Sequence, residues 1–181
     1  MMTRTVANYL GLDESDVKKI FADLSSQIKN NSDTFFSNDR AIERLIHDYK
    51  EHQNLIVAYD FDDTVKPSKP NNSCDIVIKL LRICSKLQFT MICFTVRNGQ
   101  SDIAMVKDTC KSLGISCDYI NEDCIQFKEE MENPQYAHKI FYNIFLDDRA
   151  GLESACKTLV GFLEWFFTES INEVDSRKEG Y

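Results

Sequence analysis

The chain has 181 residues, of which 43% are hydrophobic and 11% aromatic, so it carries enough apolar side chains for a buried core and is not a disordered chain. Its formal net charge of −8 argues against a broad contact with long nucleic acid, because such a contact needs a basic surface. The first residues lack the apolar core of a signal peptide, and no segment reaches the roughly 18 apolar residues of a membrane span.

The seven cysteines are an odd number, contain no CxxC pair and fall mostly at apolar positions of periodic segments. This usage is typical of reduced core residues and not of a disulfide framework or a zinc site. Together with the lack of a membrane span, it leads us to expect a soluble, cytoplasmic protein.

Residues 1–52 have helical periodicity in two segments. The first carries apolar side chains at helical spacing from Val17 to Ile28, with Asp13 or Ser15 as a candidate cap, and the second carries them from Ala41 to Tyr49. We therefore predict a helical N-terminal segment over 1–52, packed on the rest of the chain or acting as a lid.

From residue 54 short apolar runs alternate with amphipathic segments. The runs are 54–59, 89–95, 115–120 and 140–146, and the predicted helices are about 74–87, 101–113 and 151–168. Continuous apolar runs are typical of strands buried on both faces, and helical connections make neighbouring strands parallel. We predict an α/β core over 53–181 with a Rossmann-like, doubly wound and mostly parallel sheet.

Three of the predicted strands end in polar sequences, namely YDFDDT at 59–64, FTVRNG at 94–99 and FLDDRAG at 145–151. Functional sites of such sheets lie at the carboxyl ends of the strands, so these sequences are expected to meet. Asp60, Asp62 and Asp63 would repel one another unless a cation or a proton is shared. Since the cluster offers oxygen ligands and no histidine or thiolate set, the sequence predicts Mg²⁺.

The sequence DFDDT after an apolar run resembles the DxDx[TV] motif of the haloacid dehalogenase superfamily of phosphatases and phosphotransferases. Thr95 resembles the second motif of that family, Lys139 the third and FLDD the acidic fourth. The four motifs occur in the family order over about residues 54–168. A plain loop turn at the first motif is the less favoured interpretation.

The resemblance implies an enzyme, a phosphoric monoester hydrolase that acts through an aspartyl-phosphate intermediate. Asp60 would be the nucleophile, and Asp62 would act as general acid and base. Thr95 and Lys139 would hold the phosphoryl oxygens, with Lys128 as a second candidate for the lysine role.

The same resemblance implies that Mg²⁺ is bound by the carboxylate of Asp60, the backbone carbonyl of Asp62 and the carboxylate of Asp147, with Asp148 beside them. Asp63 stands where many relatives have glycine, and we expect its side chain to turn outward and hydrogen-bond the loop.

Arg97 and Arg149 are candidates for substrate contact, because a guanidinium group suits phosphate. Each could instead pair with Asp148 or Asp63, and only for Arg97 is the phosphate contact slightly favoured.

The segments between the motifs are too short for a full cap domain, so we expect an open site, which suits a large or exposed phosphate end, unless residues 1–52 fold over it as a lid. The acidic net charge nevertheless favours small phosphorylated substrates over long nucleic acid. The TxR and DDR sequences resemble those of small phage and bacterial members, of deoxyribonucleotidases and of polynucleotide 3′-phosphatase domains. A nucleotide or another small phosphate ester is therefore the expected substrate. A polynucleotide 3′-phosphatase, a non-catalytic scaffold of the same fold and phosphoryl transfer to another acceptor are the alternatives.

Overall fold

The structure is a computed structural model that describes residues 14–28, 38–69, 73–124 and 140–178. The chain divides into two compact units, Asp48–Leu152 and a unit formed by Met1–His47 with Glu153–Tyr181. The sequence predicts two parts, a helical segment over 1–52 and an α/β core over 53–181. This division stays a prediction.

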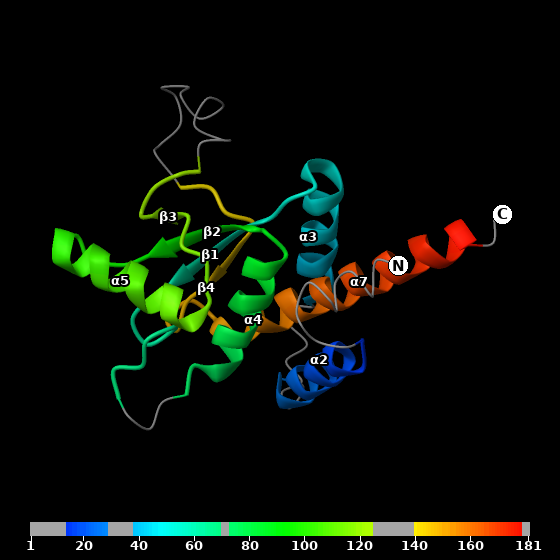
Figure 1. Cartoon of the computed structure of the whole chain (residues 1–181), viewed down its shortest axis with the longest axis horizontal. Coiled ribbons are helices and arrows are strands. Elements are labelled where there is room, and N and C mark those ends of the chain that lie inside the picture. Colours follow the sequence, from blue (N-terminus) through cyan, green and yellow to red (C-terminus); the bar gives the residue numbers. More distant parts are fainter. Residues whose placement is uncertain (1–13, 29–37, 70–72, 125–139, 179–181) are drawn as a thin grey trace. The chain divides into compact units, whose positions relative to one another are not determined.

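The first unit described here is built on a four-stranded sheet (Figure 1). Its strands are β1 (Ile56–Asp60), β2 (Thr90–Phe94), β3 (Tyr119–Ile120) and β4 (Ile144–Leu146). All pairings are parallel and the strand order is β3-β2-β1-β4. This is the doubly wound, Rossmann-like α/β arrangement that the sequence predicts.

Two helices form the crossovers, α4 (Asp75–Lys86) between β1 and β2, and α5 (Gln100–Leu113) between β2 and β3. Helix α4 packs against β2 through a buried apolar stripe that includes Leu80, Leu81 and Cys84. On the same face Tyr59 of β1 donates a hydrogen bond of 2.9 Å to the carbonyl of Ser116, beyond the end of α5. Strand residues of odd number thus point toward the helices, as the two-residue alternation requires.

The opposite face of the sheet is covered by an aromatic cluster. Ile56, Ala58 and Ile92 are buried there, and partly buried aromatic side chains pack against them. The rings of Phe94 and Phe145 lie 5.2 Å apart between centroids, and other members of the cluster are Tyr119, Phe141 and Tyr142. Both faces of β1 and β2 are therefore apolar, which explains their continuous apolar runs.

Strand β3 is shorter than the predicted run at 115–120. The backbone N–H of Met91 donates to the carboxylate of Asp118 at 2.8 Å, and the backbone N–H of Asp118 donates to the Met91 carbonyl at 3.0 Å. The Asp118 side chain thus takes a position that a strand carbonyl would otherwise hold. Hydrogen bonding through the side chain delays regular pairing until Tyr119.

Strand β4 is also shorter than predicted, 144–146 instead of 140–146. Asn143 accepts a hydrogen bond from the Ile56 N–H through its side chain, at 2.7 Å, while its own N–H donates to the Ile56 carbonyl at 2.9 Å. Further upstream the Phe141 N–H donates to the carboxylate of Asp123 at 2.9 Å. Polar side chains therefore hold this segment before regular pairing begins.

The other unit contains α2 (Glu14–Ile28), most of α3 (Asn38–His52) and most of α7 (Leu152–Lys178). Helix α7 extends to Lys178, whereas the predicted helix ends at residue 168. The prediction followed the apolar pattern, which ends before the helix does. Gly161 of α7 lies so close to Ile42 of α3 that a Cβ at Gly161 would be 2.3 Å from the Ile42 Cδ1. The glycine permits this close approach of the two helices.

All seven cysteines are free, and all except the half-buried Cys117 are buried, as expected from the sequence. Within the described residues, no helix combines the length and the apolar character that a membrane crossing requires.

Candidate active site

Three strand ends lie at the same edge of the sheet. Asp60 is in register with Phe94 at the end of β2, and Tyr59 is in register with Leu146 at the end of β4. Asp147 directly follows Leu146 and so lies level with Asp60, and Thr95 lies one residue beyond Phe94 on the other side of β1. The chain runs from β1 outward to β3 and then returns to the other side of β1, which places the switch point of the sheet between β1 and β4.

The chain turns sharply after β1. The N–H groups of Val65 and Lys66 both donate to the Phe61 carbonyl, at 3.1 Å and 2.9 Å. Asp63 adopts a left-handed backbone with φ of 64°, which explains why glycine suits this position in relatives of the motif. The Asp63 carboxylate turns to the loop and accepts hydrogen bonds from the Ser68 N–H and hydroxyl, at 2.8 Å and 2.6 Å, as expected from the sequence. These hydrogen bonds lower the pKa of Asp63.

Thr64 joins the first and fourth motifs. Its side chain is fully buried, and its hydroxyl donates to the Asp60 Oδ2 at 3.4 Å while it accepts the backbone N–H of Asp148 at 3.0 Å. The hydroxyl therefore connects two acidic loops that are far apart in the sequence. The sequence pattern includes a threonine at this position, but nothing in the pattern predicts the second hydrogen bond.

Asp60 is half-buried and lies in a negative environment. Burial raises the pKa of its carboxyl to about 6, and the charges of Asp147 and Asp148 act in the same direction. Hydrogen bonds from the Phe61 N–H and the Thr64 hydroxyl lower the pKa in part. The charges that follow β4 are therefore near enough to Asp60 to act on its carboxyl group.

Asp147 is oriented by its own loop. Its Oδ1 accepts the Arg149 N–H at 2.7 Å, while its Oδ2 accepts no hydrogen bond from the described residues. The carboxylates of Asp60 and Asp147 and the backbone carbonyl of Asp62 are hard oxygen donors, the type that Mg²⁺ prefers. No group of three or more His, Cys, Asp or Glu side chains that could hold a metal occurs in the described part of the chain, so the Mg²⁺ site stays a prediction.

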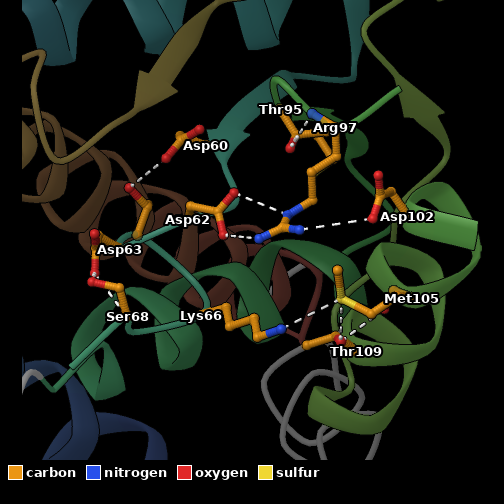
Figure 2. A network of polar contacts seen from close by, with 12 residues as sticks. Asp60, Asp62, Asp63, Lys66, Ser68, Thr95, Arg97, Asp102, Met105 and Thr109 are labelled. Atoms are coloured by element: carbon orange, nitrogen blue, oxygen red, sulfur yellow. Dashed lines mark hydrogen bonds and ion pairs between the residues drawn. The ribbon is translucent and has the colours of Figure 1, made fainter. Parts of the chain in front are cut away.

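Arg97 binds the carboxylate of Asp62 (Figure 2). Its Nε donates to the Asp62 Oδ2 at 3.0 Å and its Nη2 donates to the Oδ1 at 2.7 Å. Neither of the two pairings considered from the sequence, with Asp148 or Asp63, is the one observed. Substrate contact by Arg97 remains a prediction.

Thr95 is held by Asn121, which follows β3. The Asn121 side chain accepts the Thr95 N–H at 2.9 Å and donates to the Thr95 carbonyl at 2.6 Å. Asn121 itself has a positive φ of 55°, a conformation that asparagine tolerates better than most residues. Asn121 could not be predicted from the sequence, because an asparagine that directly follows a short strand carries no motif or spacing that indicates a site.

Arg149 is exposed at the end of the fourth motif, and its charge is one of the smaller causes that lower the pKa of Asp63. The contact of Arg149 with a substrate stays a prediction. Lys139 and Lys128, the two candidates for the third-motif lysine, lie outside the described residues.

No family model matches this chain, and no curated protein matches it. Among solved structures, the chain is similar to that of a conserved protein coded by a locus from Bacteroides thetaiotaomicron. The two chains are 21% identical, the TM-score is 0.41, and the match covers 53% of this chain and 77% of the other. A likeness of this size carries no functional argument, and the resemblance to haloacid dehalogenases remains one of sequence motifs.

Proposed function

We propose that the protein is a Mg²⁺-dependent phosphomonoester hydrolase that acts through an aspartyl-phosphate intermediate, as the haloacid dehalogenase motifs imply. The observation that supports this best is the Thr64 hydroxyl, which connects Asp60 of the first motif with the loop of Asp148 in the fourth. The two acidic motifs thus meet at the switch point of a parallel sheet, where α/β proteins bind their ligands.

In the proposed reaction an oxygen of the Asp60 carboxylate attacks phosphorus. The new bond joins Asp60 to phosphorus, and the bond from phosphorus to the ester oxygen breaks. A carboxylate needs no base for this step, and the resulting acyl phosphate is more labile than the ester. Water then attacks the same phosphorus, which releases phosphate and restores Asp60.

Asp62 handles the proton in both steps. It gives a proton to the leaving alcohol oxygen in the first step and takes one from the attacking water in the second. Its place in the turn beside Asp60 is suitable for this role, because both residues belong to one tightly bonded loop. Thr95, held by Asn121, would orient a phosphoryl oxygen through its hydroxyl.

The groups that would hold Mg²⁺ are the carboxylates of Asp60 and Asp147 and the backbone carbonyl of Asp62, with Asp148 nearby. When bound, the ion would neutralise charge on the phosphoryl oxygens and on the acidic cluster. Because the chain carries a net charge of −8, we favour a nucleotide or another small phosphate ester over a long nucleic acid.

The experiment is a phosphate-release assay with Mg²⁺ over nucleoside 5′- and 3′-monophosphates, sugar phosphates and 3′-phosphorylated oligonucleotides. Asp60→Asn is expected to lower turnover at least about 10³-fold, since the amide cannot act as a nucleophile. Asp63→Asn is the matched control, because it removes the same charge from the same turn, and asparagine tolerates the positive φ and can accept the Ser68 hydrogen bonds. It should keep most of the activity.

Activity only on sugar phosphates would contradict the nucleotide preference, and activity confined to 3′-phosphorylated oligonucleotides would favour the polynucleotide phosphatase. If the folded wild-type protein released no phosphate from any of these esters, the scaffold alternative would be favoured. Release that depends on an added alcohol acceptor would indicate phosphoryl transfer.

A further inference from the structure

We propose that Arg97 is a positioning residue that fixes the carboxylate of Asp62, and that it is not a ligand of the substrate phosphate. This inference rests on the proposed function, in which Asp62 transfers the proton. Arg97, which the sequence suggested as a ligand of the substrate, would instead orient a side chain of the site. The direction of the Asp62 carboxylate would then depend on a residue that follows β2.

The first observation is the two-point contact between the side chains. Both Asp62 oxygens accept hydrogen bonds from the guanidinium, at 3.0 Å and 2.7 Å. A forked, charge-assisted pair of this kind determines the direction of the carboxylate plane, whereas a single hydrogen bond would leave it free to rotate. Asp62 needs such a restraint, because it lies in a turn and its side chain is 38% exposed.

The second observation is that Arg97 is itself held on several sides (Figure 2). Its N–H donates to the Thr95 hydroxyl at 3.2 Å, and its guanidinium lies 5.8 Å from the centre of the Phe61 ring. Its Nη1 lies 3.9 Å from a carboxylate oxygen of Asp102, in the first turn of α5. These contacts restrain the guanidinium, so that its hydrogen bonds can in turn restrain the Asp62 carboxylate.

The third observation concerns charge. The Arg97 guanidinium lies between two carboxylates, Asp62 on one side and Asp102 on the other. Two of its donor nitrogens are occupied by Asp62, and its positive charge is compensated by these neighbours. A group in this state has little net attraction for a phosphate dianion, so direct phosphate binding is the weaker role.

The contact with Arg97 leaves lone-pair sites of the Asp62 carboxylate unoccupied. A carboxylate has about four lone-pair sites, and the fork of Arg97 uses one on each oxygen. The remaining sites can carry the proton and face the leaving oxygen. The pair thus orients Asp62 and leaves a lone-pair site on each oxygen for the proton.

The test compares Arg97→Met, Arg97→Lys and the double variant Arg97→Met with Asp62→Asn, on an alkyl phosphate and on an aryl phosphate with a good leaving group. The ratio kcat/KM reports the first step, in which only the poor leaving group needs a proton, so Arg97→Met should lower kcat/KM for the alkyl ester about ten- to a hundredfold and much less for the aryl ester. KM for the alkyl ester should change less than about threefold. Arg97→Lys should recover little, because an ammonium group cannot form the two-point contact.

The double variant isolates the coupling. If Arg97 acts through Asp62, adding Arg97→Met to Asp62→Asn should cost less than about twofold more on the alkyl ester. A KM that rises tenfold or more with an unchanged kcat, equal losses on both esters, or fully additive losses in the double variant would overturn the positioning role. In each of these cases the wild type is active and the proposed function stands. A wild-type protein inactive on both esters would instead overturn the proposed function, and this inference with it.

Discussion

Thr64 is the residue on which the two acidic loops depend. It is fully buried, and its hydroxyl acts at once as donor to Asp60 and as acceptor for the Asp148 N–H. A hydroxyl is needed because a carboxylate requires a donor and a backbone N–H requires an acceptor, and only a group with both properties serves the two partners.

We expect Thr64→Val to lower the free energy of unfolding by about 1–2 kcal/mol, because two hydrogen-bonding groups lose their partner while the shape of the side chain is kept. Urea denaturation measures this loss. Under the proposed function, turnover should fall as well, since the Asp148 loop is no longer tied to Asp60.

The matched control is Thr64→Ser, which keeps the hydroxyl and loses only a methyl group. It should retain more of the stability and of the turnover than Thr64→Val does. A loss confined to Thr64→Ser, with Thr64→Val as stable and as active as the wild type, would mean that the methyl group, and not the hydroxyl, carries the effect.

At the same scale, the sequence could predict which residue types gather at the site but not how they bond. Asp60, Thr95 and Asp147 follow apolar runs, and parallel pairing alone brings such strand ends to one edge. The contact of Arg97 with Asp62 depends on the shapes of two loops, which the motif spacing does not determine. For this reason the sequence offered Asp63 and Asp148 as partners and missed Asp62, the residue directly before Asp63 in the chain.

At the scale of elements, the helices of the sheet unit were predictable to within one or two residues. Helix α4 has a stripe of buried side chains at helical spacing, and α5 ends where Gly114 adopts a left-handed conformation with φ of 69°. A glycine just after an apolar periodic segment is a strong stop signal. The short strands were predicted less well, because Asp118 and Asn143 bond to the backbone of neighbouring strands through their side chains.

We expect Gly114→Ala to lower the free energy of unfolding by about 1 kcal/mol, because the left-handed backbone is unfavourable for a residue with a Cβ. Space is not the reason, since a Cβ at this position would lie 3.8 Å from its nearest neighbour, the Arg82 Nε. Thermal or urea unfolding measures the loss.

Gly114→Asn provides the comparison, as asparagine tolerates the left-handed region better than alanine. Its loss should be smaller than that of Gly114→Ala. An alanine variant as stable as the wild type would show that α5 does not end in this conformation in solution.

At the scale of the whole molecule, the sequence predicted an α/β core and a helical N-terminal segment, and both kinds of structure are present. It did not predict that the last helix groups with the N-terminal helices. That grouping is supported by the close approach of Gly161 in α7 to Ile42 in α3. The sequence does not predict the contact between these helices. A glycine within a helical pattern ordinarily indicates only a weak helix former, and not a close approach of a second helix.

We expect Gly161→Ala to destabilise the protein even though alanine favours a helix by about 1 kcal/mol over glycine. The added Cβ would lie 2.3 Å from the Ile42 Cδ1 and 3.0 Å from its Cγ1, so the two helices or the isoleucine must shift. A lower midpoint of urea unfolding is the expected result.

Combining Gly161→Ala with Ile42→Val tests the contact directly, because valine lacks the Cδ1 atom. The double variant should be more stable than the sum of the single changes predicts. Simple additivity would show that the two side chains do not meet.

The position of β4 in the sheet has a further consequence for how the molecule forms. Strand β4, which Asp147 follows, pairs with β1 through residues 87 positions apart in the sequence, as the bond from the Ile56 N–H to Asn143 also shows. Pairings between such distant segments form late and slowly, because the loop between them must first be ordered. Under the proposed function, a chain that has folded only β1, β2 and their helix would therefore lack Asp147 beside Asp60, and activity would arise only when β4 pairs with β1.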